Sequence, residues 1–577
     1  TLAGRDRADV LAMARRYQSR AVIDRAFGQA RALIERELRE QELNTQDLES
    51  LDGLLSALLY PSARLRAAAE TLASNRKGQH GLWGFGISGD YPILLARLKS
   101  EEETTLVRDV VRAHAYWRRR GINVDVVIRV DKETGYGQEL QGELYRLIVR
   151  MGSDSYLNQR GGIYLLSSDQ MAAEDRVLLE TAARVVLDGS RGTLAAQLGA
   201  PAAEPVRLPA FVPTLSQPED VEPTPELPRP PSLIHDNGLG GFSPDGREYQ
   251  IYLRPGERTP RPWINVIANP RLGFMVSEAG AGSTWAENSA ENRLTPWSND
   301  PVSDPLGEAI YLRDEETALI WSPTPQPAPA AAPYLVRHGT GYSIVEHHSH
   351  GLRQQLRLFA AADSPVKVIA LRLENHWQRS RRLTATYYAP WVLGTSREAT
   401  APYVVSEYEP DVHALLAHNP YSAEFAGRCA FLAASQAPHG VTADRTEFLG
   451  RMGDPRRPAG LGRVGLEGTV RAGLDPCAAI QLHVELEAGQ VKEIYFLLGQ
   501  GADREEAVSL ARHFGDPAKM EAAWQEAQSF WEDMLAAVTV ATPDPAMDRM
   551  LNRWLLYQAL VCRMWGRSAL YQPSGAF

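Results

Sequence analysis

The residue types best suited to chemistry lie in one polar segment, from Glu287 to Asp314. It gathers amide, carboxylate and guanidinium side chains around a single large aromatic residue, Trp297; these side chains belong to Asn288, Asn292, Arg293, Asn299, Asp300, Asp304, Glu308 and Arg313. Amides and carboxylates hydrogen-bond to hydroxyl groups, and an indole ring packs against C–H groups. A sugar offers both kinds of surface, so the composition of this segment favours saccharide binding.

The same segment allows a plainer interpretation. Its two X-Pro steps, Thr295-Pro296 and Asp300-Pro301, disfavour helix because the residue before a proline is pushed towards extended geometry. A long irregular loop costs ordering entropy and buries little apolar surface. Asn and Asp side chains in such loops often cap their own backbone. A turn-rich connection is therefore the alternative to a sugar site.

Three carboxylates in the segment raise the question of catalysis. Asp300, Asp304 and Glu308 are candidates for the acid and base of a glycoside hydrolase, which needs two carboxyl groups at a defined separation. Spacing along the chain does not fix that separation, and carboxylates that alternate with proline commonly form turns. We therefore assign no catalytic residue from the sequence.

Residues 84–89 match the pattern GxGxxG, and Asp109 lies downstream of it, as in dinucleotide-binding proteins. However, the preceding stretch 76–83 is not an apolar strand, and Asp109 falls within a helical pattern. Pro92 indicates a helix start after a turn. We expect no dinucleotide site and no cofactor.

The segment Glu346–His350 is the main concentration of candidate metal ligands. On a strand, His348 and His350 would share a face, but the sequence offers no evident third ligand. We favour solvated imidazoles on an exposed strand and expect no metal site.

Composition excludes several classes of protein. The chain has 577 residues, 44% hydrophobic and 23% charged, as in globular proteins with more than one domain. Its net charge of −10 argues against a surface for nucleic acid or anionic membranes. The three cysteines, Cys429, Cys477 and Cys562, have no CxxC spacing, which favours a reducing compartment. No apolar run approaches the length of a membrane span.

The predicted organisation is α+β and multidomain. Helical spacing of apolar residues dominates the first part, β-rich segments punctuated by Gly, Pro and Asn dominate the middle, and helices return at the end. Ten prolines between residues 201 and 231 predict a linker. The predicted regions are 1–80 (helical), 81–200 (small α/β), 201–231 (Pro-rich linker), 232–502 (large antiparallel β-sandwich) and 503–577 (linker helices).

Individual elements follow from the same patterns. Predicted helices are 106–120, 174–187, 504–514, 520–535 and 546–565. Predicted strands are 124–130, 162–166, 249–253, 273–277, 354–359, 366–373, 383–388 and 494–498. The last helix has a broad apolar stripe, which indicates that it packs inside a larger helical assembly.

A family resemblance rests on several long segments. They are 81–95 (GLWGFGISGDYPILL), 113–128 (AHAYWRRRGINVDVVI), 236–251 (DNGLGGFSPDGREYQI), 259–274 (TPRPWINVIANPRLGF), 287–314, 445–451 (RTEFLGR), 475–481 (DPCAAIQ) and 551–577. With these segments the chain resembles the cyclic β-1,2-glucan synthases, in the region related to cellobiose and chitobiose phosphorylases. The resemblance covers nearly the whole chain.

The resemblance implies an architecture and an activity. The architecture is a large β-sandwich, a helical linker and a six-hairpin α/α barrel that holds the active site, of which 503–577 would supply only the start. The activity is inverting phosphorolysis or reversible transfer at a β-glucosidic bond, with inorganic phosphate as co-substrate. In similar sequences the sugar-binding stretch and the general acid follow Phe577. We therefore expect the chain to be a fragment with a truncated barrel, inactive alone.

The resemblance also suggests where substrate and partners meet the chain. Arg293, Trp297, Asn299 and Asp300 would border the barrel entrance from the sandwich; Tyr571, Gln572 and Ser574 would enter its mouth from the other side. The implied partners are a β-glucan or glucosyl substrate and the rest of the same polypeptide, with a homodimer left open and no nucleic acid. The parent would lie at the cytoplasmic side of the bacterial inner membrane, with this part itself soluble.

Three hypotheses follow. The first is the sandwich and linker part of a glucan synthase or glycoside phosphorylase. The second is a non-catalytic carbohydrate-binding module for β-glucan. The third is a free-standing hydrolase that uses the carboxylates between residues 300 and 308.

Overall fold

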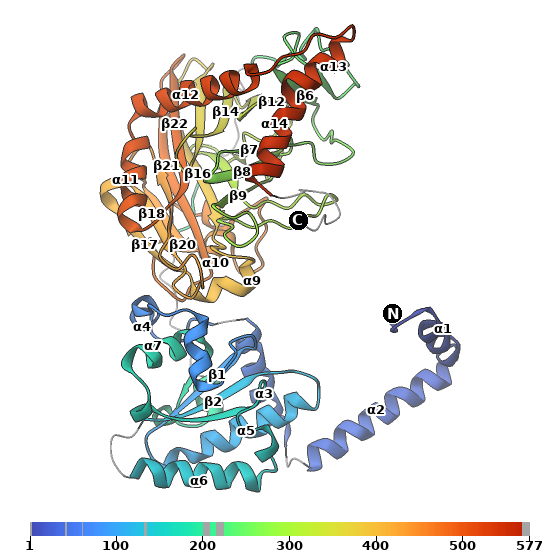
Figure 1. Ribbon diagram of the computed structural model, residues 1–577, viewed down its shortest axis with the longest axis vertical. Coiled ribbons are helices and arrows are strands. Elements are labelled where there is room, and N and C mark those ends of the chain that lie inside the picture. The colour runs from blue at the N-terminus through green and yellow to red at the C-terminus, as the bar shows by residue number, and fades with distance from the viewer. Residues whose placement is uncertain are drawn as a thin grey trace. The chain divides into compact units, whose positions relative to one another are not determined.

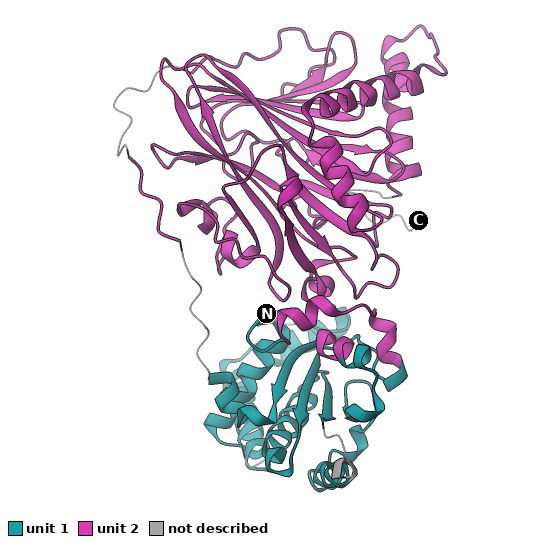
Figure 2. Cartoon of the chain, turned by 90° about the vertical axis from the view of Figure 1, so that its left-hand side faces the viewer, with its two compact units in different colours: residues 1–66, 84–176, 183–202 teal, residues 67–83, 177–182, 203–577 magenta. Residues whose placement is uncertain are grey.

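The computed structural model of the chain describes residues 3–40, 43–60, 62–131, 136–199, 208–214 and 224–567. Its residues group into two units, which Figure 2 colours separately. Unit 1 comprises residues 1–66, 84–176 and 183–202, and unit 2 comprises residues 67–83, 177–182 and 203–577.

Unit 1 is built on a four-stranded parallel sheet in the order β3-β2-β1-β4. The strands are β1 (Ile93–Leu98), β2 (Asp125–Val130), β3 (Ile163–Ser167) and β4 (Ala183–Asp188). Every residue of β2 is buried, as expected for a central strand of a parallel sheet that is covered by helices. The strands predicted at 124–130 and 162–166 are confirmed.

Helices of unit 1 cover this sheet and continue towards the N-terminus. They are α1 (Arg7–Arg16), α2 (Arg20–Glu40), α3 (Thr45–Leu59), α5 (Thr104–Arg118), α6 (Tyr136–Arg150) and α8 (Leu194–Gly199). Two further helices, α4 (Ala69–Ser74) and α7 (Ala173–Ala182), are assigned wholly or in part to unit 2. The apolar side of α5, including Val107, Val110 and Trp117, is buried in the core of unit 1. In contrast, α1 and α2 bury no residue.

Two predictions in this part of the chain are wrong. The predicted helix 174–187 ends at Ala182, and the next residues form β4. The run Val185–Leu187 carries β-branched and apolar residues that pair with β1, so tertiary pairing overrides the helical spacing. Pro92 precedes β1 instead of starting a helix. The residues before the GxGxxG pattern form a 3₁₀ turn (η1, Gln79–Phe85), which removes the strand that a dinucleotide site requires.

Unit 2 contains three antiparallel sheets (Figure 1). A ten-stranded sheet has the order β17-β18-β19-β22-β15-β14-β13-β12-β6-β5, a five-stranded sheet the order β11-β10-β16-β21-β20, and a three-stranded sheet the order β7-β8-β9. The strands are β5 (Gly240–Phe242), β6 (Glu248–Leu253), β7 (Ile264–Ala268), β8 (Leu272–Ser277), β9 (Gly282–Ala286), β10 (Ala309–Asp314), β11 (Ile320–Trp321), β12 (Tyr334–Gly339), β13 (Tyr342–Ser349), β14 (Leu352–Ala360), β15 (Val366–Asn375), β16 (Arg381–Pro390), β17 (Val405–Glu409), β18 (Ala414–His418), β19 (Cys429–Ala434), β20 (Gly440–Asp444), β21 (Pro476–Leu486) and β22 (Val491–Gly501).

The main core of unit 2 lies between these sheets. Apolar side chains from the ten-stranded sheet pack against those of the five-stranded and three-stranded sheets, and Trp321 and Trp391 are among the largest fully buried side chains. Alternate residues of β14 are buried and accessible, which is the pattern of a strand in a sandwich. The predicted large antiparallel sandwich and its six predicted strands are confirmed.

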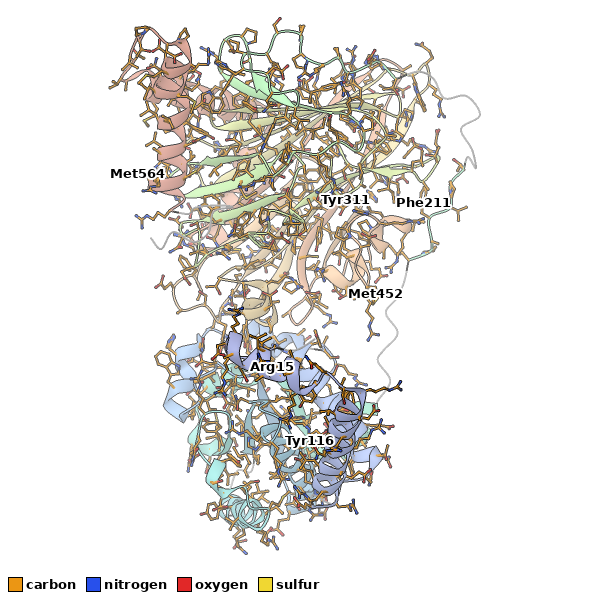
Figure 3. The ribbon with its side chains drawn as sticks, turned by 90° about the vertical axis from the view of Figure 1, so that its right-hand side faces the viewer. Arg15, Tyr116, Phe211, Tyr311, Met452 and Met564 are labelled. Carbon is orange, nitrogen blue, oxygen red and sulfur yellow. The ribbon has the colours of Figure 1, made fainter. Side chains whose placement is uncertain are left out.

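Part of the predicted linker runs along the sandwich. The amide of Phe211 donates to the carbonyl of Gly462 over 2.9 Å, and the guanidinium of Arg313 lies 4.2 Å from the centre of the Phe211 ring. Figure 3 marks Phe211 and Tyr311, whose hydroxyl donates to the carbonyl of Pro455. The described residues 208–214 are therefore attached to unit 2.

Helices follow the last strand and cover the sandwich. α11 (Arg504–Phe514) and α12 (Pro517–Ala536) pack on the ten-stranded sheet, where Trp524 meets Phe359. The last helix runs from Pro545 to Trp565 as α13 (Pro545–Arg549), π-helical η9 (Met550–Trp554), α14 (Leu555–Gln558) and π-helical η10 (Ala559–Trp565). Short helices α9 (Arg397–Thr400) and α10 (Arg445–Leu449) lie in the long connections.

The fold class agrees with the prediction. The chain is α+β and multidomain, with an N-terminal helical and α/β part, a large antiparallel β-sandwich and C-terminal helices. Within the described ranges, no helix combines the length and the apolar character needed to cross a membrane.

Candidate functional site

The polar loop after β9 is fastened to the sandwich at its start. The side chain of Asn288 accepts hydrogen bonds from the amides of Ala290 and Glu291, so it caps its own turn. Asn292 is buried and donates to Ala286 O and to Gln500 Oε1, over 2.8 and 2.7 Å. The side chain of Asn288 therefore caps its own turn, whereas that of Asn292 joins the loop to β22.

Arg293 is held by backbone carbonyls. Its Nε donates to Ser289 O over 3.1 Å and its Nη1 donates to Thr395 O over 3.0 Å. Burial lowers the pKa of the half-buried guanidinium from its usual value, but an arginine still keeps its charge in proteins. No carboxylate among the described residues forms an ion pair with it. The loop therefore presents a fixed positive charge.

Trp297 packs against a cluster of aromatic and aliphatic side chains between the three-stranded sheet and the C-terminal helices. The half-buried Trp297 packs against this cluster, which contains Val266, Ala268, Met275, Trp285, Trp531, Leu535, Tyr557 and Val561, with Phe530 and Trp565 at its margin. We call this set the tryptophan cluster. Trp531 and Trp565 lie with their ring centres 5.5 Å apart. One face of the loop is thus packed against the last helix.

The start of the loop also reaches the end of that helix directly. The hydroxyl of Ser289 donates a hydrogen bond to the carbonyl oxygen of Gly566, the residue after η10. The structure therefore brings the Arg293 and Trp297 loop to the point where the chain leaves the last helix. Tyr571, Gln572 and Ser574, the predicted residues on the opposite side, lie outside the described residues.

The tip of the loop is formed by Asn299 and Asp300. Asn299 is exposed and has a φ of +39°, a conformation that Asn tolerates better than most residues. Asp300 Oδ1 accepts hydrogen bonds from the amides of Val302 and Ser303, and its Oδ2 accepts from the Ser303 hydroxyl. The Ser303 hydroxyl and these amides lower the pKa of Asp300. Asp300 is an ionised turn former and is unsuited to be a general acid.

The other two carboxylates point into the sandwich. Asp304 is buried and accepts from the Ser277 hydroxyl over 2.6 Å. Glu308 is buried as well, and its Oε2 lies 2.6 Å from the ammonium of Lys367. Burial alone raises the pKa of Glu308, but the Lys367 charge and hydrogen bonds from Lys367, Thr284 and Tyr387 outweigh it and keep the pKa low.

Glu308 holds the loop in position through hydrogen bonds. Its Oε1 accepts a hydrogen bond from the Thr295 hydroxyl over 2.9 Å, and Thr295 Oγ1 accepts from the amide of Thr284 over 2.7 Å. The buried Glu308–Lys367 pair thereby fixes the backbone two residues before Trp297. Neither Asp304 nor Glu308 is placed to exchange protons with a substrate.

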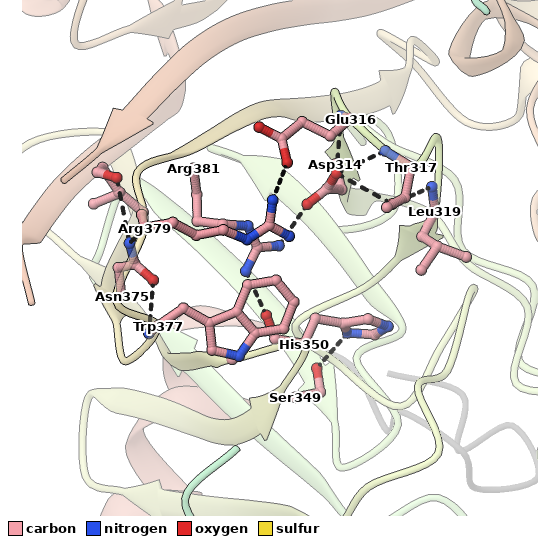
Figure 4. A network of polar contacts seen from close by, with 12 residues as sticks. Asp314, Glu316, Thr317, Leu319, Ser349, His350, Asn375, Trp377, Arg379 and Arg381 are labelled. Atoms are coloured by element: carbon pink, nitrogen blue, oxygen red, sulfur yellow. Dashed lines mark hydrogen bonds and ion pairs between the residues drawn. The ribbon is translucent and has the colours of Figure 1, made fainter. Parts of the chain in front are cut away.

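The far end of the predicted segment is part of a buried charge network (Figure 4). Arg381 pairs with Asp314, donates to His350 O over 2.7 Å, and lies with its guanidinium 4.0 Å from the centre of the Trp377 ring. Arg379 pairs with Glu316 beside it. Arg313 is buried and pairs with Glu315. These charges hold the turn between β10 and β11 and do not face a ligand.

His347 and His350 stack on aromatic rings and are not the solvated imidazoles that the sequence predicted, whereas His348 is half-buried. His347 is buried and stacks on Tyr334 with ring centres 3.9 Å apart, while its Nδ1 lies 2.9 Å from Pro333 O. His350 stacks on Trp321. Burial lowers the pKa of both imidazoles to about 4. Among the residues described, no group of His, Cys, Asp or Glu is arranged to hold a metal ion.

Sequence reasoning missed the tryptophan cluster around the loop. The sequence predicted a broad apolar stripe on the last helix, formed by Met550, Trp554, Tyr557, Leu560 and Val561. The sequence did not indicate that Trp285 and Trp297 would meet this stripe, because the partners are more than 200 residues apart.

Comparisons with known proteins identify the family. The profile "Glycosyl hydrolase 94, supersandwich domain" matches residues 247–517, and "Glycosyl hydrolase 94 superfamily, catalytic domain" matches residues 530–577. The chain is 36% identical over 591 residues to the cyclic beta-(1,2)-glucan synthase NdvB of Rhizobium meliloti, a match that covers 100% of this chain and 21% of that protein.

Two phosphorylases match a shorter part of the chain. The N,N'-diacetylchitobiose phosphorylase of Vibrio proteolyticus is 25% identical over 58% of this chain and 42% of its own length. The solabiose phosphorylase of Paenibacillus borealis is 27% identical over 57% of this chain and 44% of its own length. The chain thus spans about a fifth of the synthase and under half of each phosphorylase. With both of its profiles and these relatives in agreement, the chain belongs to glycosyl hydrolase family 94.

Proposed function

We propose that this chain is the sandwich and linker part of an enzyme that acts on β-glucans, and that it supports and borders the site of reaction. One relative is by name a cyclic beta-(1,2)-glucan synthase, and others are by name phosphorylases of N,N'-diacetylchitobiose and of 3-O-beta-D-glucopyranosyl-beta-D-glucuronide. The observation that carries the proposal is the contact of Ser289 with Gly566. It places the polar loop beside the segment that the catalytic-domain profile matches.

The loop residues take different roles in this proposal. The indole of Trp297 packs against the C–H face of a glucosyl unit, and Arg293 and Asn299 hydrogen-bond to its hydroxyls. Asp300 shapes the tip of the loop, because its carboxylate oxygens are already engaged by Val302 and Ser303. Tyr571, Gln572 and Ser574 complete the border from the other side.

The proposed reaction of the whole protein is transfer or phosphorolysis at a β-glucosidic bond with inversion. One carboxylic acid protonates the leaving oxygen while inorganic phosphate, or a sugar hydroxyl, attacks from the opposite face. We assign this acid to none of Asp300, Asp304 and Glu308. Asp300 is engaged within the loop tip, and Asp304 and Glu308 are engaged within the sandwich. We place the whole protein at the cytoplasmic side of the inner membrane.

A non-catalytic β-glucan-binding module is the second candidate. The carboxylates of Asp300, Asp304 and Glu308 are all engaged in bonds within the protein. The described loop can therefore bind a sugar but has no carboxylate ready to cleave one, which favours the binding module. A phosphate assay tests a result that both candidates require: residues 1–577 with β-1,2-gluco-oligosaccharides and inorganic phosphate should form no sugar phosphate. Turnover at an ordinary enzymatic rate would contradict both candidates.

Affinity electrophoresis tests the proposed binding. We expect the chain to be retarded in gels that contain linear β-1,2-glucan, and Trp297→Ala to lose most of that retardation. Val302→Ala is the matched control, because Val302 lies in the same loop and is 90% exposed. Equal retardation in gels that contain an α-1,4-glucan, or no retardation of the native chain in either gel, would overturn the proposal.

A further inference from the structure

A cavity of about 670 Å³ lies between the sandwich and the last helix, and Val266, Tyr557 and Val561 of the tryptophan cluster are among its lining residues. The strands β5, β6 and β7 and the residue His338 form one wall, and the helix from Met550 to Arg563 forms the other. The volume falls within the range of about 300–1,000 Å³ that small-molecule sites occupy. None of the candidate loop residues lines it.

Aromatic rings dominate the wall of this cavity. Phe242, Tyr249, Trp263, Trp554 and Tyr557 all line it. Phe242 and Tyr249 pack edge to face with ring centres 5.0 Å apart, and Tyr249 and Trp263 do so at 5.9 Å. The rings of Phe242, Tyr249 and Trp263 are half-buried, so they remain accessible from the cavity. The sandwich wall is therefore a rigid aromatic surface.

The polar groups deep in the cavity are already satisfied. Asn265 donates to Gly339 O and Tyr342 O, and accepts from the Tyr557 hydroxyl. Both ring nitrogens of His338 have partners, Ser343 Oγ and Trp263 O. These residues hold the walls in place.

The helix wall supplies further polar groups. Gln558 and Arg563 line the cavity and are exposed. They are five residues apart, a spacing that would separate them on an α-helix, but η10 is π-helical and its wider turn lets both face the same cavity. η9 also lines the cavity, through Met550 and Trp554. π-Helical turns of this kind occur frequently at functional sites.

We propose that this cavity is a second saccharide site, which holds a glucosyl unit of a β-glucan without cleaving it. The sugar's C–H face packs against Tyr249 and Trp263, and its hydroxyls bond to the Gln558 amide and the Arg563 guanidinium. No carboxylate occurs among the described residues of the wall, so the site has no acid or base for hydrolysis. The choice of a β-glucan as ligand depends on the proposed function; the cavity itself does not.

A pair of tryptophan substitutions tests the site without disturbing the core. Ala559 and Leu556 are both exposed residues of the last helix, but only Ala559 lines the cavity. We expect Ala559→Trp to fill the cavity and weaken binding of linear β-1,2-gluco-oligosaccharides, measured by isothermal titration calorimetry, at least tenfold. Leu556→Trp should bind as the native chain does. Circular dichroism and thermal unfolding confirm that both variants fold.

Two smaller substitutions examine the polar contacts. Gln558→Ala and Arg563→Ala should each weaken binding about 2- to 12-fold, the range expected for loss of one hydrogen bond. If all three cavity variants bind as tightly as the native chain, the cavity is not a saccharide site. If Ala559→Trp instead changes the mass measured by light scattering, the cavity is a protein contact, and the inference also fails.

The loop variant separates this inference from the proposed function. If Trp297→Ala abolishes oligosaccharide binding and Ala559→Trp does not, the border role of the loop stands and the cavity site is refuted. If Ala559→Trp abolishes binding and Trp297→Ala does not, the cavity site stands and the role of the loop is refuted. An absence of binding by the native chain refutes both.

Discussion

The ammonium of Lys367 lies 2.6 Å from Glu308 Oε2 inside the sandwich, where both side chains are almost completely buried. β15 carries the lysine, and the glutamate is the last residue before β10. The pair therefore joins the ten-stranded and five-stranded sheets, and through Thr295 it fixes the loop that carries Trp297.

Removal of one charge of this pair should be costly. We expect Glu308→Gln to lower the free energy of unfolding by about 3–5 kcal/mol, because Lys367 is left buried without its counter-ion. Urea unfolding of the native and variant chains measures the difference. The double substitution Glu308→Gln with Lys367→Met should recover part of the loss, since no buried charge remains and the glutamine amide oxygen still accepts a hydrogen bond from the neighbouring hydroxyl groups. A loss below about 1 kcal/mol in the single variant would contradict the assigned role.

The Asp300 side chain should act through its acceptor oxygens and not through its proton. We expect Asp300→Asn to bind β-1,2-glucan as the native chain does, because an amide oxygen still accepts from the amides of Val302 and Ser303. Asp300→Ala should bind more weakly and be cut faster by protease between residues 298 and 303. Hydrolytic activity in the native chain that disappears in Asp300→Asn would instead support a hydrolase.

The buried histidines of the sandwich should make it sensitive to acid. Burial lowers the pKa of His338, His347 and His350 to about 4, below the value of about 6.5 in an unfolded chain. The unfolded state therefore binds more protons between pH 6.5 and 4, and the stability present above pH 6.5 is lost as the pH falls through this window. Each histidine contributes up to about 1.4 kcal/mol per pH unit.

Urea unfolding at several pH values between 7 and 4 measures this slope. Carboxylates that are paired in the folded state also lose stability in acid, so the native slope alone is not diagnostic. His347→Gln is the control, because it removes one titrating imidazole from its contacts with Tyr334 and Pro333. Its slope should be shallower than that of the native chain. An equal slope would show that His347 does not titrate in this range.

The sequence predicted correctly those helices and strands in which the spacing of the apolar residues matches the side that is buried. α11 begins and ends where it was predicted, because the apolar residues Ala507, Ala511 and Phe514 share one buried side. β22 and β15 were recognised for the same reason, as runs of apolar and β-branched residues. β4 falls inside a predicted helix, because its short apolar run directly continues α7. Only the pairing of β4 with β1 distinguishes this strand from a continued helix.

The contacts of the polar loop could not be foreseen from the sequence. Trp297 packs against the last helix, whereas Glu308 and Arg313 are buried. A charged residue in a polar stretch normally predicts exposure, and its burial depends on a partner such as Lys367, 59 residues away. The aromatic cavity could not be predicted for the same reason, because only the fold brings Tyr249 and Trp263 opposite Trp554.

The hydrogen bond from Ser289 to Gly566 should couple the loop to the last helix. Ser289→Ala leaves the Gly566 carbonyl without this donor at the end of η10, and we expect faster amide hydrogen exchange in residues 559–567, with a loss of about 0.5–1.5 kcal/mol in stability. Ser303→Ala is the matched control, since Ser303 bonds only within the loop tip. The tryptophan cluster packs the same two segments together, so the helix should loosen at its end and not detach. Unchanged exchange in residues 559–567 would show that the apolar contacts alone hold the loop beside the helix, and the border proposed for Arg293 and Trp297 would then depend on Trp285 and Trp565.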